Sequence, residues 1–154
     1  MSKILIDKKA VTELLTKLVK INSVNPDLDP EAEGEAEIAD FLGDYLKRMG
    51  LQVFYQTISL GRKNVIGVLK GSGGGKTLML NAHTDTVSLD NMTNPLTPVI
   101  VDGRLYGRGS YDMKGGLVSC LMAVDSIITS GKRIKGSVIL ALVADEEYVS
   151  VGTE

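Results

Sequence analysis

The sequence has a single cysteine, Cys120, a single histidine and no tryptophan. One cysteine rules out a disulfide within the chain and suits a reducing compartment, so we expect a cytoplasmic protein. Charge is nearly balanced, with 17 Lys and Arg against 19 Asp and Glu, which gives no reason to expect a nucleic acid or a membrane as partner. No apolar run is long enough to cross a bilayer, and the run at the amino end is too short for a secretory signal.

The rest of the composition is that of a globular domain. Of the 154 residues, 44% are apolar and 23% are charged, which is enough to bury a core. Apolar periodicity and turn residues predict helices over 8–20, 30–49 and 113–130, and strands over 52–59, 64–69, 77–81, 99–101, 104–106 and 137–144. This order predicts an α/β layered domain. The acidic residues Glu31, Glu33 and Glu35 are interpreted as a solvated helix face.

The only histidine, His83, closes an apolar strand and is followed two residues later by Asp85. Residues i and i+2 at a strand end point the same way. A histidine that binds a metal usually donates its other ring N–H to a carboxylate or a carbonyl. The pair therefore fits a metal ligand, His83, that Asp85 orients. Taken alone, the spacing is more commonly that of a core histidine with a neighbouring carboxylate.

A further acidic residue, Asp112, lies in the glycine-rich segment 107–116, where the third predicted helix begins. Glycines allow the backbone to approach a ligand closely, and the helix dipole stabilises an ionised carboxylate at this end. These properties favour a ligand-binding role for Asp112. A plain N-cap aspartate is the alternative.

Three consecutive acidic residues, Asp145, Glu146 and Glu147, follow the most apolar strand. Ligands bind outside the carboxyl ends of strands in open α/β sheets. Adjacent carboxylates near a low-dielectric strand end repel one another unless a cation or a proton is bound, and a pair of divalent metals would supply the cation. The alternative is an acidic loop in solvent, which needs neither. Combined with His83 and Asp112, the donor set suits zinc, with cobalt or manganese also compatible.

The segment 71–77 is similar to a phosphate-binding P-loop but is not one. Lys70 stands where that loop requires a glycine, and the segment leads into a predicted strand rather than a helix. We therefore exclude nucleotide binding by this segment.

At these residues the sequence resembles the acetylornithine deacetylase / succinyl-diaminopimelate desuccinylase family of co-catalytic zinc peptidases and amidohydrolases. The segments that carry the resemblance are 81–87, 107–116 and 144–147, in this order, and the similarity extends to 23–26. It implies a zinc-peptidase-type catalytic domain with a mixed, largely parallel central sheet flanked by helices. The implied reaction, most similar to the acetylornithine deacetylase branch, is hydrolysis of the amide bond of an N-acyl amino acid or small peptide.

The resemblance also implies a role for each site residue and a cofactor of two divalent ions, with zinc favoured. His83 would bind one metal, Asp112 would bridge both, and Glu147 would be a terminal ligand. Glu146 would act as the general base, and Asp85 would orient His83.

The chain departs from the family in its length. Family members continue further, adding another acidic ligand, a second histidine ligand and an inserted lid and dimerisation domain. We therefore expect residues 1–154 to be the amino-terminal part of the catalytic domain of a longer, homodimeric enzyme. The isolated chain should be incomplete at its carboxyl end, expose strand edges and apolar surface, and be inactive. The alternative is a non-catalytic binding or scaffold domain that keeps the fold.

Overall fold

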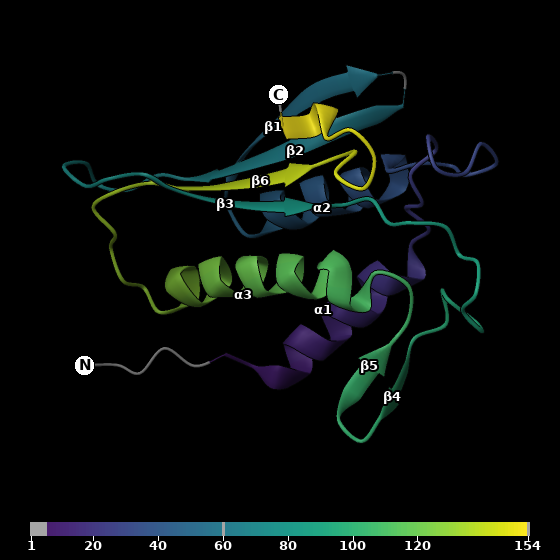
Figure 1. Ribbon diagram of the computed structural model, residues 1–154. Helices are drawn as coiled ribbons and strands as arrows, with labels where there is room; N and C mark the ends of the chain where they lie inside the picture. Colours follow the sequence, from purple (N-terminus) through teal and green to yellow (C-terminus); the bar gives the residue numbers. More distant parts are fainter. Residues whose placement is uncertain (1–5, 60, 154) are drawn as a thin grey trace.

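A computed structural model describes residues 6–59 and 61–153. Its elements in chain order (Figure 1) are α1 (Lys8–Lys20), α2 (Ala36–Arg48), β1 (Gln52–Ser59), β2 (Arg62–Leu69), β3 (Leu78–His83), β4 (Val99–Val101), β5 (Arg104–Tyr106), the irregular turn η1 (Ser110–Gly115), α3 (Gly116–Thr129), β6 (Val138–Val143) and the short turn η2 (Val151–Thr153). Among the described residues, no helix has the length and apolarity needed to cross a membrane.

Four strands form the main sheet in the order β1-β2-β6-β3, and β4 and β5 form a separate hairpin. The β1–β2 and β2–β6 pairs are antiparallel, whereas β3 and β6 are parallel. The predicted mixed sheet is confirmed, but the expectation that it is largely parallel is wrong for these strands. The reason is connection length: β1 and β2 follow one another too closely for a crossover, while α3 supplies the crossover between β3 and β6.

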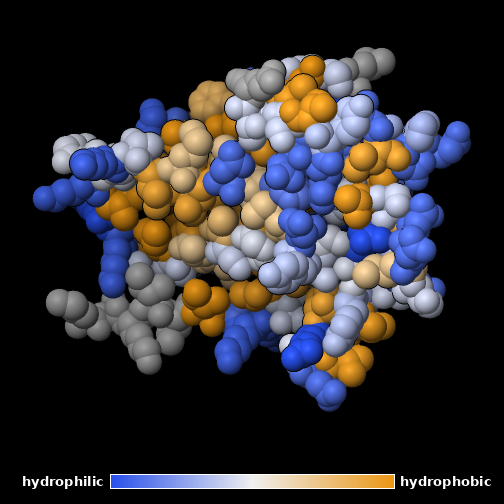
Figure 2. Space-filling model, viewed as in Figure 1, coloured by the Kyte–Doolittle hydropathy of each residue, from blue (hydrophilic) through white to orange (hydrophobic). Residues whose placement is uncertain are grey.

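The helices gather on one face of the sheet (Figure 1). Alternate residues of the strands, including Val65, Leu140 and Leu142, point toward this face and join one apolar core with leucines of all three helices. No helix of the described residues covers the opposite face, and Phe54 and Met79 there are 56% and 57% exposed. The expected apolar surface is therefore present, and Figure 2 shows further apolar side chains on the projecting β4–β5 hairpin.

Two predicted helix starts are wrong. The second helix begins at Ala36, not at residue 30, because turns fill the intervening segment and Gly34 has a φ of +74°. Regular helix α3 begins at Gly116 because Asp112 has an extended backbone (φ −116°, ψ 106°) within η1. That irregular turn directs the Asp112 carboxylate toward the end of the sheet where β3 and β6 stop.

Candidate metal centre

The parallel pairing of β3 and β6 brings the first and last acidic motifs together. His83 at the end of β3 pairs with Val143 at the end of β6, and the ladder continues where the Thr84 N–H donates to the Val143 carbonyl at 2.8 Å. The residues that follow each strand therefore emerge side by side at one edge of the sheet. This is the arrangement expected for ligand sites at the carboxyl ends of strands.

Three of the predicted ligands meet at this edge. His83, Asp112 and Glu147 each offer one ligand atom, and the three atoms lie within 4.8 Å of one another. The histidine is only 4% exposed while the Asp112 side chain is 71% exposed, so the group lies at the boundary between core and solvent. One imidazole nitrogen and two carboxylate oxygens form a donor set that fits a divalent ion such as zinc.

Glu146 lies beside these three side chains. Its Oε2 is 3.5 Å from His83 Nε2, and its side chain is half exposed. Burial, together with the charges of Asp112, Asp85 and Glu146, raises the pKa of Glu147 despite the opposing effect of His83. The carboxylates are thus crowded enough to repel one another, and a divalent cation would relieve that repulsion.

Asp85 is fully buried and connects the two strand ends. Its Oδ1 accepts the Glu146 backbone N–H at 3.1 Å, and its Oδ2 accepts the Glu147 N–H at 3.0 Å. The same Oδ1 lies 3.3 Å from His83 Nδ1, which also lies 3.1 Å from the Asp85 carbonyl oxygen. Asp85 therefore contacts the histidine as well as the backbone that carries both glutamates.

His83 holds a proton tightly. Burial lowers the pKa of His83, but hydrogen bonds to Asp85 and Asp112 and the charges of Asp85 and Glu146 outweigh this effect and raise the pKa to about 9. Asp112 Oδ1 is 3.1 Å from His83 Nε2, so a proton there takes the position that a metal ion would take. A metal must displace this proton to bind.

The buried side chain of Lys114 anchors the glycine-rich segment to the end of α1. Its Nζ donates to the carbonyls of Leu18 and Ile21, both at 2.9 Å, at the carboxyl end of α1. Burial lowers the pKa of Lys114 to about 8. In the same segment, Gly109 has a φ of +72°, and a Cβ there would lie 2.6 Å from Thr86 Cγ2, so this close approach requires glycine.

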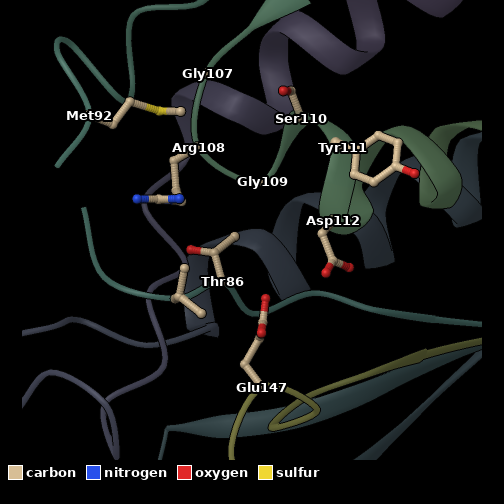
Figure 3. A pocket seen from close by; sticks show the side chains of 10 residues that line it. Thr86, Met92, Gly107, Arg108, Gly109, Ser110, Tyr111, Asp112 and Glu147 are labelled. Atoms are coloured by element: carbon tan, nitrogen blue, oxygen red, sulfur yellow. The ribbon is translucent and has the colours of Figure 1, made fainter. Parts of the chain in front are cut away.

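A cavity of about 250 Å³ opens beside the three ligands. Figure 3 shows Asp112 and Glu147 turning toward one another on one side of it, while Arg108 lies on the other side near Met92. The Arg108 Nη2 donates to the Asp90 carbonyl at 3.0 Å. The cavity thus has negative groups at one end and a cation at the other.

Sequence reasoning missed a buried polar cluster behind the site. Glu35, interpreted above as part of a solvated face, is completely buried and accepts two hydrogen bonds from Arg62, at 2.7 and 2.8 Å. Asn25, inside a segment of the family resemblance but given no role, contacts both Asp85 and Asp145. No local pattern reveals these contacts, because the partners are between 27 and 120 residues apart.

Both the sequence and the fold are similar to those of known proteins. Residues 79–154 match Peptidase family M20/M25/M40. The chain is 31% identical over 148 residues to N-formyl-4-amino-5-aminomethyl-2-methylpyrimidine deformylase of Halalkalibacterium halodurans, covering 92% of this chain and 35% of that protein. It is 33% identical over 149 residues to succinyl-diaminopimelate desuccinylase of Polynucleobacter necessarius, covering 90% of this chain and 37% of that protein. Human carnosine dipeptidase 1 shares the fold, with a TM-score of 0.79 at 23% identity, over 94% of this chain and 34% of that one.

The fold and the three converging side chains define the class, an α/β domain with a candidate site for a divalent metal. The chain belongs to the M20/M25/M40 peptidase family, which confirms the family resemblance seen in its motifs. It spans little more than a third of the length of the curated relatives described above.

Proposed function

We propose that this chain carries part of the catalytic centre of a metal-dependent amide hydrolase that acts on N-acyl amino acids or small peptides. The observation that carries the proposal is the convergence of His83, Asp112 and Glu147 ligand atoms within 4.8 Å, with Glu146 beside them. Membership of the M20/M25/M40 peptidase family supports the same reaction class. Within that class we favour an acetylornithine deacetylase-like substrate, in the cytoplasm.

The donor set fits two zinc ions, with cobalt or manganese also compatible, and His83, Asp112 and Glu147 would hold these ions in part. When bound, such ions activate water and polarise an amide carbonyl. Glu146 takes the proton of the attacking water and delivers it to the leaving amine, a general acid–base role for which a half-exposed carboxylate beside the ligands is suitably placed. Asp85 holds the His83 ring so that Nε2 faces the site.

We further propose that the remaining ligands, a lid and a dimer interface belong to a longer protein of which residues 1–154 form the amino-terminal part. Two facts support this: the chain spans 35% and 37% of the length of the two curated relatives described above, and one face of its sheet exposes apolar side chains. On this view the isolated chain binds metal weakly and hydrolyses little or nothing.

The test has two parts. Zinc affinity, measured by titration of the chain and of Glu147→Ala, shows whether the proposed ligands bind metal; equal affinities would reject them. Reading the coding DNA beyond the codon for Glu154 then decides the fragment question. If the reading frame continues, hydrolysis of an N-acetyl amino acid is assayed with the longer protein that it encodes. A stop codon, together with no turnover, would instead favour a non-catalytic binding or scaffold domain.

A further inference from the structure

Asn25 lies at the centre of the buried cluster behind the metal centre, and its side chain is fully engaged at both ends. The amide Nδ2 donates to Asp85 Oδ2 at 2.8 Å and to Asp145 Oδ1 at 3.0 Å. Its Oδ1 accepts the Asp27 backbone N–H at 3.0 Å and Arg62 Nη2 at 3.3 Å. Two acceptors face the nitrogen and two donors face the oxygen, so only one orientation of the amide satisfies all four contacts.

The two carboxylates that Asn25 joins belong to the two strand ends that build the site. Asp85 follows β3, and its carboxylate receives the backbone N–H groups of Glu146 and Glu147. Asp145 follows β6 and directly precedes Glu146. Both aspartates are completely buried, and without a donor between them their charges would repel. Asn25 therefore links the turn that carries both glutamates to the segment that carries His83.

The conformation of that turn is specified by its contacts. Asp145 has a φ of +68°, a left-handed conformation that non-glycine residues rarely adopt. Its N–H donates to Glu35 Oε1 at 3.2 Å, its Oδ1 accepts Arg62 Nη2 at 2.9 Å, and its carbonyl accepts the Ser150 N–H at 2.7 Å. Arg62 thus donates to the same Asp145 oxygen as Asn25 does, and Asn25 connects that oxygen to Asp85.

The backbone of Asn25 is held independently of its side chain. The Asn25 N–H donates to the Thr86 carbonyl at 2.9 Å, and the Thr86 N–H donates to the Ser23 carbonyl at 2.9 Å. This short parallel bridge remains if the Asn25 side chain is removed. Truncation at residue 25 therefore separates loss of the amide contacts from loss of the local chain path.

We propose that Asn25 is a positioning residue of the metal centre, because its amide joins Asp85 to Asp145 and so fixes the backbone of Glu146 and Glu147 relative to His83. It contacts neither the proposed ligands nor the proposed base, and it acts through the two aspartates. The expected effect of Asn25 on metal binding and turnover rests on the function proposed above. Its expected effect on the backbone of Glu146 and Glu147 is independent of that function.

The experiment compares Asn25→Ala with Asn22→Ala, a matched control in the same segment. Among the described residues, the Oδ1 of Asn22 accepts only the Val24 N–H, at 3.2 Å. Amide hydrogen exchange by NMR is measured first, on the metal-free chain. In Asn25→Ala we expect the Glu146 and Glu147 amides to exchange roughly fivefold to tenfold faster, the factor for one weakened hydrogen bond, while the amides of β6 keep their protection. Asn22→Ala should leave both regions unchanged.

Zinc affinity is measured next on the same three proteins, by competition with a chromophoric chelator. We expect about a tenfold loss for Asn25→Ala and none for Asn22→Ala, as for other residues that support metal ligands. If the original chain binds no zinc while the glutamate amides still respond to Asn25→Ala, the proposed function fails and the positioning of the turn stands. Unchanged exchange of those amides overturns the positioning role whatever the zinc result.

A second variant covers the case in which Asn25→Ala unfolds. Asn25→Ser keeps a donor and an acceptor on a shorter side chain, and it should give the same selective change at Glu146 and Glu147 with a smaller amplitude. Loss of β6 protection in both variants would overturn the proposal, because Asn25 would then support the whole fold rather than this turn.

Discussion

His83 and Asp112, 29 residues apart in the sequence, meet with 3.1 Å between Nε2 and Oδ1. In the metal-free chain this contact is a charge-assisted hydrogen bond, because His83 remains protonated up to a pKa of about 9. A divalent ion would replace the shared proton without moving either residue far. The same pair therefore stabilises the fold at neutral pH and, under the proposed function, would supply ligand atoms to a metal.

One prediction follows for the stability of the metal-free chain. Folded His83 titrates near 9 and unfolded histidine near 6.5, so between these values the folded state binds more protons. The free energy of unfolding should therefore fall as pH rises, by about 1–2 kcal/mol between pH 6.5 and 8. Urea titrations in the presence of a chelator measure it.

The control is His83→Gln, which should lack this decline because His83 is the only histidine. Measurement stops at pH 8 because Lys114 then acts in the opposite sense. Its folded pKa of about 8 is below the ordinary value of 10.5, so above pH 8 the unfolded state binds more protons and stability rises. A decline of equal size in both proteins would contradict the assignment to His83.

The two adjacent glutamates should separate by role. Glu146→Gln should reduce turnover of the longer product by about 10²–10⁴-fold, the range for loss of a general base, with zinc affinity nearly unchanged. Glu147→Ala should lower zinc affinity instead, since it removes one of the three ligand atoms that converge at the proposed site. Turnover and zinc titration on the same preparations measure both. Equal loss of zinc in the two variants would end the division of roles.

Asp85→Asn keeps the side-chain volume but replaces one acceptor oxygen with an NH₂ group that faces other donors. Because Asp85 accepts backbone N–H groups from Glu146 and Glu147 and contacts His83, we expect zinc affinity to fall by about 10–100-fold. Asp90→Asn, in the exposed loop beyond, serves as the matched control and should have no effect. Calorimetric zinc titration makes the comparison, and equal affinities in the two variants would argue against orientation by Asp85.

Lys114→Met should destabilise the chain by about 1–3 kcal/mol, because two carbonyls at the end of α1 lose a buried donor. It should also weaken zinc binding, since Asp112 lies two residues away in the same turn. Lys76→Met, at an exposed position, controls for the loss of charge. Urea denaturation and zinc titration give the two effects, and a variant as stable as the control would show that the lysine does not anchor the segment.

The parts of the candidate site that depend on local sequence patterns are predictable from the sequence. His83 and Glu147 each lie at or just after the end of an apolar strand, and parallel pairing of those strands brings them together. The glycine-rich surroundings indicate Asp112, although the sequence predicts a regular helix from residue 113 where the structure has the irregular turn η1. The roles of these residues stay predictions.

Other features could not be predicted because they depend on distant partners. Glu35 looks like a surface acid until Arg62, 27 residues later, is placed against it. Asn25 reaches Asp85 across 60 residues, and nothing near either residue signals the contact. The resemblance implies a largely parallel sheet, whereas β2 runs antiparallel to β1 because their connection is too short for a crossover.

The uncovered face of the sheet has a thermodynamic consequence. Phe54 and Met79 already lie largely in water before the chain unfolds, so unfolding hydrates less new apolar surface than in a domain whose sheet is covered on both faces. The heat-capacity change of unfolding should therefore fall below the value of about 2 kcal/mol/K typical of a chain of this length. The dependence of stability on urea concentration should be correspondingly shallow.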